Sequence, residues 1–457
     1  MSLGAVVILV LVLMLALLLL RVPVAVSLGL AGAIGLVLLH GFNHATLELG
    51  ADPFSQIASF SLTIVPMFVL MGMFAVRAHV AEYVFAIADR VLSRFPGGLG
   101  VATVVASAGF SAVSGSSIGT AATMARLAVG EMRKSGYPAH MATALVAVAG
   151  TLGSMIPPST FLVLYAILSQ QSVGEMLAAG IVPGALSALA YAIWIGFAGW
   201  QLRRRGQVVA DADNVQDALS QAKAIQAENR RHAPLSSLPW RGLGYILLLF
   251  AIVLGGMYSG IFTATESAAF GAIAAVLILI WELRKQGAKG IWQGIKGALE
   301  STAGTTAMVF FIIIGSGILS AFFVSAGVPG MVTDAVSSWN LSPTWIMLIL
   351  LLCLVPMGMV LESLSLLMIS VPLILPVALE FGFDPIWLGI LIVKFIEIGM
   401  VTPPVGINAF VVSGATGVKS ETVFRGIIPF FVIDMILILI FFFTPDLILF
   451  LPGLVQN

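Results

Sequence analysis

The chain is poor in charge. Only 9% of its 457 residues are Asp, Glu, Lys or Arg, whereas 60% are hydrophobic. A soluble domain carries roughly 25% charged residues, so this sequence cannot cover a water-facing surface. The shortage excludes a soluble enzyme, a nucleic-acid-binding protein and a disordered chain. Long apolar runs indicate a polytopic α-helical membrane protein, because a β-barrel would show alternating segments of about ten residues.

Other features are missing as well. The single cysteine, Cys353, excludes an intrachain disulfide framework and a cysteine-ligated metal site. No Walker A glycine loop is present, so we expect no ATP hydrolysis. The five histidines show no metal-ligand spacing, and His40 and His44 fall in an expected extramembrane loop, 40–57. Because the basic segment and cleavage site of a signal peptide are also missing, we interpret residues 3–20 as a true helix.

What the sequence has is a series of apolar segments. A transmembrane helix needs about 20 mostly apolar residues. Two stretches, 98–130 and 344–379, are interrupted by small and polar residues, and we interpret each as a re-entrant hairpin of two short helices. The other predicted spans are 3–20, 24–39, 58–76, 139–169, 181–200, 242–262, 265–283, 304–326, 386–414 and 426–444.

The basic residues predict the orientation. Residues 201–241 form the only strongly polar stretch, which the positive-inside rule makes a cytoplasmic linker. With that loop inside, all 21 Lys and Arg residues except Lys394 fall on the cytoplasmic side. Both termini are then predicted to lie outside. The first hairpin opens to the cytoplasm and the second to the outside.

The two halves of the chain match at a fixed offset of 246 residues. The second unit, 242–457, repeats positions of the first unit, 1–200, without a gap: Gly136, Gly153, Pro157-Pro158 and Glu175 correspond to Gly382, Gly399, Pro403-Pro404 and Glu421. Matched Leu or Val residues in two apolar segments can arise by chance, but Gly and Pro residues that match in register are harder to attribute to chance. Each unit has five predicted spans and one hairpin, and five is odd, so the second unit enters the membrane inverted. Inverted repeats are typical of secondary transporters, which bind substrate near the midplane at broken helices.

Two Pro-Pro pairs interrupt predicted spans. The first lies in Gly153-Ser154-Met155-Ile156-Pro157-Pro158-Ser159, and the second in Thr402-Pro403-Pro404-Val405-Gly406-Ile407-Asn408. Each pair removes two backbone donors and clashes with the preceding turn. In lipid, freed carbonyls are tolerated only where they line a cavity or bind something. We predict a Na⁺ or substrate site at these breaks, with a plain proline kink as the alternative.

The hairpin tips are the other candidate elements. The first tip contains Ser114-Gly115-Ser116-Ser117, whose small side chains permit a tight reversal. The helix that starts there presents free N–H groups that suit a carboxylate, although an ordinary packing face is the alternative. The second tip, 357–363, carries Glu362, and an acid within a membrane segment is a functional candidate. Its structural alternative is pairing with a backbone group or with Lys394.

Charged residues inside the spans have two interpretations. Lys394 and Glu397 are three residues apart in one predicted span, which slightly favours a structural ion pair. The alternative is that Lys394 counters an anionic substrate. Glu266 and Asp434 are further intramembrane acids, to which the sequence assigns no role.

At these motifs the chain resembles the large membrane subunit of the tripartite ATP-independent periplasmic (TRAP) transporters. The resemblance runs from Arg21-Val22-Pro23 to Phe450-Leu451-Pro452 and includes both Pro-Pro motifs. It implies an all-α elevator-type fold of the ion-transporter superfamily, in which a transport domain moves both hairpins and both broken helices. The chain departs from the family pattern at Glu362, where Asp is usual, at Gly119 and at Arg126.

The resemblance also implies a function. It implies Na⁺-coupled import of small carboxylates, such as C4-dicarboxylates or sialic acid, across a bacterial inner membrane, with Na⁺ as coupling ion and no other cofactor. It implies two partners, a small four-helix membrane subunit and a soluble periplasmic substrate-binding protein. The alternatives are a carrier that works alone and a channel. An intramembrane enzyme using Ser116 or Glu362 lacks a basic partner at a recognisable spacing.

The motifs and the resemblance together give two sets of candidate ligands. The predicted substrate ligands are Ser116, Ser117, Ser159, Glu362, Lys394 and Asn408. The predicted Na⁺ ligands are Ser114, Gly115, Gly153, Pro157, Gly358, Glu362, Thr402, Pro403 and Val405.

Overall fold

The computed structural model describes residues 2–20, 22–92, 95, 97–204, 238–328, 330–331, 341–359 and 361–455. Nearly all of the predicted linker, 201–241, therefore lies outside the described residues. Every regular element in the described ranges is a helix. Six of the helices are long and apolar enough to cross a membrane, or seven if the bent pair α9–α10 is one span. The predicted all-helical membrane fold is confirmed.

The helices begin and end as follows: α1 (Leu3–Leu19), α2 (Val24–His40), α3 (Phe42–Ile57), η1 (Phe60–Thr63), α4 (Ile64–Arg77), α5 (Val80–Leu92), α6 (Gly98–Ser114), α7 (Ser117–Met124), η2 (Ala125–Val129), α8 (Gly130–Lys134), α9 (Ala139–Met155), α10 (Thr160–Leu168), α11 (Val173–Arg204), α13 (Arg241–Phe250), η4 (Ala251–Gly255), α14 (Gly256–Tyr258), α15 (Ala264–Leu283), η5 (Arg284–Gln286), α16 (Gly287–Ser325), α18 (Pro343–Leu352), α19 (Leu354–Gly358), α20 (Ser363–Glu380), α21 (Pro385–Val401), α22 (Ile407–Thr416), α23 (Ser420–Phe443) and α24 (Pro445–Val455).

One expectation about a loop was wrong, and one predicted span belongs to a longer helix. The segment 40–57 is not a loop, because His40 ends α2 and residues 42–57 form α3, which packs on α2 and α16. No Gly or Pro interrupts residues 43–49, so nothing local stops a helix there. The span predicted at 304–326 is the second half of α16, which is 39 residues long. At 1.5 Å per residue α16 measures about 58 Å, roughly twice the hydrocarbon core of a bilayer.

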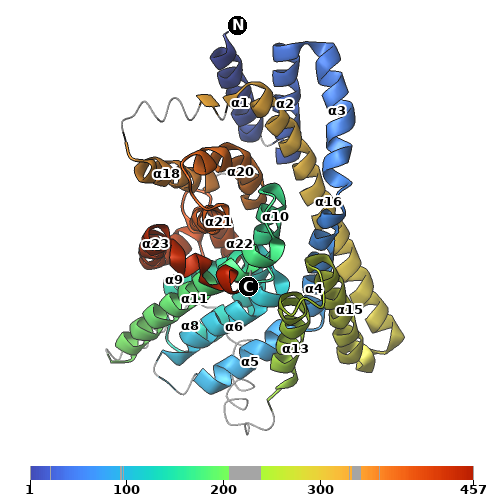
Figure 1. Cartoon of the computed structure of the whole chain (residues 1–457). Helices are drawn as coiled ribbons and strands as arrows, with labels where there is room; N and C mark the ends of the chain where they lie inside the picture. Colours follow the sequence, from blue (N-terminus) through green and yellow to red (C-terminus); the bar gives the residue numbers. More distant parts are fainter. Residues whose placement is uncertain are drawn as a thin grey trace.

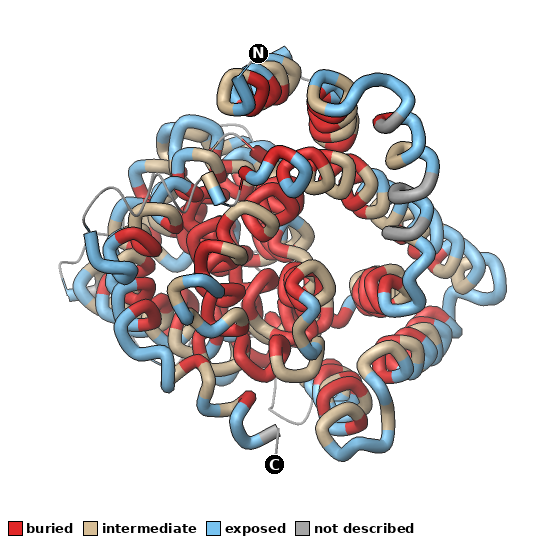
Figure 2. The backbone as a smooth tube through the Cα atoms, turned by 45° about the horizontal axis from the view of Figure 1, so that its top comes forward, coloured by how far each residue is buried: buried red, intermediate tan, exposed pale blue. Residues whose placement is uncertain are grey.

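The helices form two groups (Figure 1). In the first, α16 packs on α2, α3 and α4, and α15 packs on α4. In the second, α9 contacts α6, α7, α11, α21, α22 and α23. The most buried backbone lies in this second group, at the centre of the view in Figure 2. Every residue of α21 from Ile386 to Val401 is buried, so α9 and α21 form the middle of the fold.

The offset of 246 residues has a counterpart in the helices. α9 and α21 begin and end at positions that correspond at this offset. Gly136 and Gly382, which precede them, both adopt positive φ, 90° and 76°, a conformation that favours glycine. The short helices after the breaks, α10 and α22, also correspond closely. That the second unit is inverted in the membrane stays a prediction.

Glu266 has a structural role at the start of α15. Its carboxylate accepts hydrogen bonds from the backbone N–H and the hydroxyl of Thr263, while the Thr263 hydroxyl accepts from the Glu266 N–H. This reciprocal pair is a capping box, which satisfies donors that the first helical turn leaves free. The sequence had left this acid without a role.

The contact between α2 and α16 depends on glycine. A Cβ on Gly315 of α16 would lie 2.2 Å from the carbonyl oxygen of Ala25, and one on Gly32 of α2 would lie 2.7 Å from the Leu319 backbone. Small residues let two helices approach this closely, which supplies packing energy where water is excluded. The α2–α16 contact therefore has no room for an added methyl group.

We predict that Gly315→Ala destabilises the protein by about 1–3 kcal/mol, the usual cost of overpacking. The matched control is Gly304→Ala in the same helix, where a Cβ would meet nothing within 4 Å. The measurement is the midpoint temperature of unfolding in detergent. Equal midpoints for the two variants would contradict the tight α2–α16 contact.

Candidate functional site

The first predicted break is present in the structure. α9 ends at Met155 and α10 begins at Thr160, with a bend of 41° between them. Pro157 and Pro158 have no N–H to donate, so the helical ladder cannot continue. Ser159 caps α10 and also donates from its hydroxyl to the carbonyl oxygen of Ser154 at 2.5 Å. Ser159, which we predicted to bind substrate, therefore supplies a hydrogen bond to a backbone carbonyl at the break.

The second break is more open. α21 ends at Val401 and α22 begins at Ile407. The Thr402 hydroxyl donates to the carbonyl oxygen of Ile398 at 2.6 Å. Gly406 has φ +51° and a Cβ there would lie 2.7 Å from the Phe424 ring, so the turn requires glycine. Pro403 and Val405 between them are exposed.

The first hairpin tip reverses the chain at Gly115. This residue has φ +58°, and Ser116 caps the returning helix α7 by accepting from the Gly119 N–H at 3.1 Å. The Ser114 hydroxyl lies 3.0 Å from that of Thr120. The tip is therefore rich in hydroxyl oxygens, which suit a hard cation.

Each hairpin tip touches the broken helix of its own half. A Cβ on Gly115 would lie 2.9 Å from the Pro158 carbonyl oxygen, and one on Gly153 would lie 3.0 Å from the Ser116 backbone. In the second half, a Cβ on Gly399 would lie 2.7 Å from the Cα of Gly358. Gly153 and Gly399 correspond at the offset of 246, so both halves use glycine at the same place to bring backbones together.

Glu362 takes the structural role that we weighed for it. Its carboxylate accepts from the backbone N–H and from the hydroxyl of Ser365, both at 3.1 Å. It thereby caps α20, and a carboxylate is well suited to that position. Its charge is not paired with Lys394, whose ammonium binds Glu397 and Asp434. Binding of Na⁺ or substrate by Glu362 stays a prediction.

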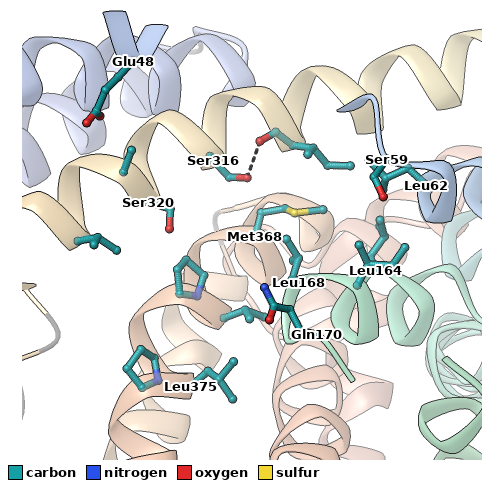
Figure 3. A pocket seen from close by; sticks show the side chains of 18 of the residues that line it. Glu48, Ser59, Leu62, Leu164, Leu168, Gln170, Ser316, Ser320, Met368 and Leu375 are labelled. Carbon is teal, nitrogen blue, oxygen red and sulfur yellow. Dashed lines mark hydrogen bonds between the residues drawn. The ribbon is translucent and has the colours of Figure 1, made fainter. Parts of the chain in front are cut away.

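A cavity of about 710 Å³ separates the two groups of helices (Figure 3). On one side it is lined by α16, with Ser316 and Ser320, and by Glu48 of α3. On the other side it is lined by Met368 of α20 and by Gln170, which follows α10. Its described lining includes none of the predicted ligands. The cavity lies beside the returning arm of the second hairpin.

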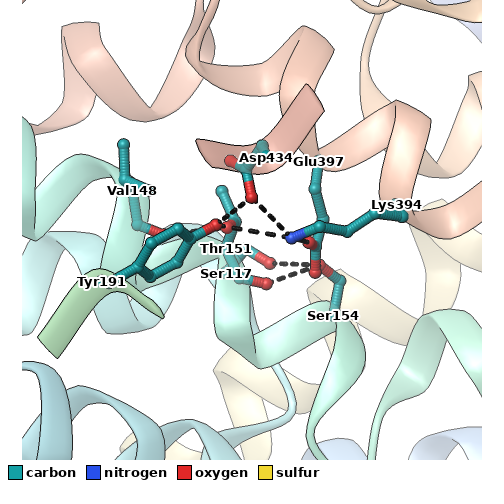
Figure 4. A network of polar contacts seen from close by, with 8 residues as sticks. All are labelled: Ser117, Val148, Thr151, Ser154, Tyr191, Lys394, Glu397 and Asp434. Atoms are coloured by element: carbon teal, nitrogen blue, oxygen red, sulfur yellow. Dashed lines mark hydrogen bonds and ion pairs between the residues drawn. The ribbon is translucent and has the colours of Figure 1, made fainter. Parts of the chain in front are cut away.

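Lys394 lies in a fully buried polar network (Figure 4). Its ammonium contacts Glu397 at 3.0 Å and Asp434 at 2.9 Å. The ion pair with Glu397 that we favoured is therefore present. Asp434, which the sequence had left without a role, is a second partner. A substrate contact by Lys394 stays a prediction.

Three further residues complete this network. The Tyr191 hydroxyl donates to Asp434 at 2.5 Å. The Ser154 hydroxyl lies 2.7 Å from Glu397, and the Ser117 hydroxyl lies 3.2 Å from Ser154. Sequence reasoning missed Tyr191. The sequence did contain a signal: Tyr191 lies inside the predicted span 181–200, and a hydroxyl within an apolar span needs a polar partner.

Two buried polar atoms near the breaks have no partner in the described part of the chain. They are the side-chain oxygen of Asn408 and the hydroxyl of Ser363. The Asn408 amide group donates to the carbonyl oxygen of Ala147 in the other broken helix at 3.3 Å. A buried polar atom without a partner costs about 1–3 kcal/mol, so both atoms are suited to a bound ligand.

Comparison with known proteins agrees with this geometry. Residues 11–447 match the family described as the DctM component of the tripartite ATP-independent periplasmic transporter. The chain belongs to this family. The resemblance seen in the sequence is thereby confirmed, and the chain is the large permease component of a TRAP transporter.

Individual relatives show the range of the DctM family. The chain is 33% identical to the C4-dicarboxylate TRAP transporter large permease DctM of Pseudomonas aeruginosa over 430 residues, 93% of each chain. It is 30% identical to the sialic acid TRAP transporter large permease SiaM of Vibrio cholerae, covering 91% of this chain and 90% of that one. The crystal structure of the YdaH transporter of Alcanivorax borkumensis has the same fold, with a TM-score of 0.62 and 13% identity over 94% of this chain and 98% of the other.

We predict that Lys394→Met destabilises this DctM-family chain by about 3–5 kcal/mol. The substitution leaves the Glu397 and Asp434 carboxyl groups buried without their cation, and removing one partner of a buried ion pair has this cost. The control is Lys419→Met, because Lys419 is exposed. Unfolding midpoints in detergent provide the comparison, and an unchanged midpoint for Lys394→Met would show that the network contributes nothing to stability.

We predict that Gly399→Ala lowers uptake by about tenfold, because the methyl group pushes the second hairpin tip off the broken helix and overpacking of about 1–3 kcal/mol follows. Gly414→Ala is the matched control, since a Cβ there meets nothing within 4 Å. Initial uptake rates in proteoliposomes, normalised to inserted protein, test this. If both variants transport equally, the contact is not required.

Proposed function

We propose that this chain is the transport subunit of a Na⁺-coupled, binding-protein-dependent importer of small organic acids. The observation that carries the proposal is the pairing of each hairpin tip with a Pro-Pro break in its own half. Hairpins and broken helices at corresponding positions of two repeats are the usual site of substrate and ion in secondary transporters. The names of the relatives from Pseudomonas aeruginosa and Vibrio cholerae, which specify C4-dicarboxylate and sialic acid, support a carboxylate substrate.

The donor groups at the breaks fit Na⁺. A hard cation takes oxygen ligands, and the first tip offers hydroxyl groups of Ser114 and Thr120 beside the carbonyl of Gly115. At the second break the side-chain oxygen of Asn408, and at the second tip the hydroxyl of Ser363, have no partner among the described residues. These groups are uncharged, so they would hold Na⁺ without placing a negatively charged side chain in the membrane, which is costly.

The division into two groups of helices supports an elevator movement. The first group would stay fixed, whereas the second group, which contains both hairpins and both breaks, would carry the substrate across. The cavity between α16 and α20 means that the two groups are not packed tightly along that part of their boundary. Sliding there would disrupt fewer contacts than movement through the core around α9 and α21.

The partners follow from the family. Its description as tripartite supports a small membrane subunit and a periplasmic binding protein. The isethionate relative of Oleidesulfovibrio alaskensis is named DctMQ, and the match covers 88% of this chain but only 59% of that protein. The additional length there is consistent with a fused small subunit. We place the complex in the bacterial inner membrane with both termini periplasmic.

The test is uptake of a radiolabelled C4-dicarboxylate or sialic acid into proteoliposomes that contain this chain, the small subunit and the binding protein. We expect uptake to require an inward Na⁺ gradient and both partners, because the ion gradient supplies the free energy. Uptake that persists with Na⁺ absent throughout and a proton gradient supplied would refute Na⁺ coupling. Rapid ohmic current without the binding protein would instead indicate a channel.

A further inference from the structure

The buried network around Lys394 contains more negative than positive charge if every acid is ionised. Its charged groups are one ammonium, Lys394, and two carboxyl groups, Glu397 of the same helix and Asp434 of α23. Tyr191 of α11 is the other titratable group that faces them. All four side chains are buried. An isolated buried charge is so costly that a group usually neutralises instead, so a net charge of −1 here calls for a proton.

The Lys394 ammonium has an acceptor for each of its hydrogens, so its own hydrogen bonds do not require an additional proton. A lysine ammonium has three hydrogens to donate. Lys394 has three acceptors in reach: Asp434 at 2.9 Å, Glu397 Oε2 at 3.0 Å and the Tyr191 hydroxyl at 3.4 Å. The Tyr191 hydroxyl in turn donates its own hydrogen to Asp434. Asp434 therefore receives two donors on one oxygen, as an ionised carboxylate does.

The contacts of the Ser154 hydroxyl indicate which group carries the proton. Its oxygen lies 2.7 Å from the Thr151 carbonyl oxygen and 2.7 Å from Glu397 Oε1. A carbonyl and an ionised carboxylate can only accept, and one hydroxyl has only one hydrogen. Both short contacts are satisfied only if one partner donates to Ser154, and a backbone carbonyl cannot. The Ser117 hydroxyl also lies 3.2 Å from Ser154. Its hydrogen can point to Ser154, but it supplies no hydrogen for the contact between Ser154 and Glu397, so one of the two short contacts still lacks a donor.

We propose that Glu397 is a proton-binding site, with the proton on Oε1. The Glu397 O–H then donates to Ser154, Ser154 donates to the Thr151 carbonyl, and Oε2 accepts from the Lys394 ammonium. The cluster becomes one cation, one carboxylate at Asp434 and one neutral acid, with no net charge. The charge count calls for one proton in the cluster, and the hydrogen bonds of Ser154 assign it to Glu397.

The site is placed to respond to movement of the transport elements. Ser154 lies just before the Pro157-Pro158 break, and Ser117 is the first residue of α7 in the first hairpin. When Glu397 releases its proton, Oε1 becomes an acceptor that competes with the Thr151 carbonyl for the single Ser154 hydrogen. Proton binding is thus linked to the hydrogen bonds of the first broken helix. This inference goes beyond Na⁺ coupling, because it concerns a different ion at a different place.

The test is infrared spectroscopy of the purified full-length chain at neutral pH in a maltoside detergent, which has no carbonyl group of its own. A protonated carboxyl group gives a C=O band above the amide I region, which an ionised carboxylate lacks. We expect this band in the wild type, its loss in Glu397→Gln and its retention in Glu300→Gln. Glu300 is the matched control because its side chain is 66% exposed. Because no transport is measured, failure here is distinct from failure of the proposed Na⁺ coupling.

Two measurements decide between Glu397 and Asp434 as the protonated group. In the wild-type protein, ¹³C labelling of glutamate carboxyl groups should shift the band, and labelling of aspartate should not. In Ser154→Ala the band should also shift, because Glu397, and not Asp434, is the acid that contacts Ser154 in the described structure, and this variant keeps all four buried titratable groups. A band that moves only with labelled aspartate, or no band at all in the wild type, would overturn the proposal.

Discussion

Backbone carbonyls that lipid cannot solvate are the constraint on which this fold depends. At both Pro-Pro breaks the helical ladder stops within a predicted span, because proline has no N–H to donate. The molecule answers by placing other polar groups against each break. At the first break the Ser159 hydroxyl donates to the Ser154 carbonyl oxygen, and at the second the Thr402 hydroxyl donates to the Ile398 carbonyl oxygen. Each hairpin tip also packs its backbone closely against the broken helix of its own half, so a break and its tip form one packed unit.

Glycine makes that unit possible. Gly153 and Gly399 let a hairpin tip reach the backbone of a broken helix, and the same device brings α2 onto α16. In a membrane the hydrophobic effect does not drive helices together, so their association depends on close van der Waals contact. Of the glycines that matched at the offset of 246, Gly153 and Gly399 are positions at which a side chain would separate two backbones, whereas Gly136 and Gly382 adopt positive φ. This explains why Gly and Pro, rather than Leu and Val, revealed the repeat.

Much of this could be predicted from the sequence, but not all of it. The breaks and tips were predictable because Pro and Gly act locally, and the Lys394–Glu397 pair because helical spacing puts residues three apart on one face. The helix α3 was missed, since a helix that packs on its neighbours needs no long apolar run. Tyr191 and Asp434 were missed as partners of Lys394 because they lie on α11 and α23, and no sequence spacing reveals contacts between separate helices.

The arrangement of charge connects these observations. A chain with so few charged residues has buried three of them, Lys394, Glu397 and Asp434, in its interior. Hydrophobic packing of similar volume is often at least as stable as a buried ion pair, so stability does not explain why they are there. Their position does, because Glu397 reaches Ser154 beside the first break while Lys394 reaches Tyr191 and Asp434 on the opposite side. The cluster joins the two halves of the chain, and a single proton there changes which hydrogen bonds the first broken helix can keep.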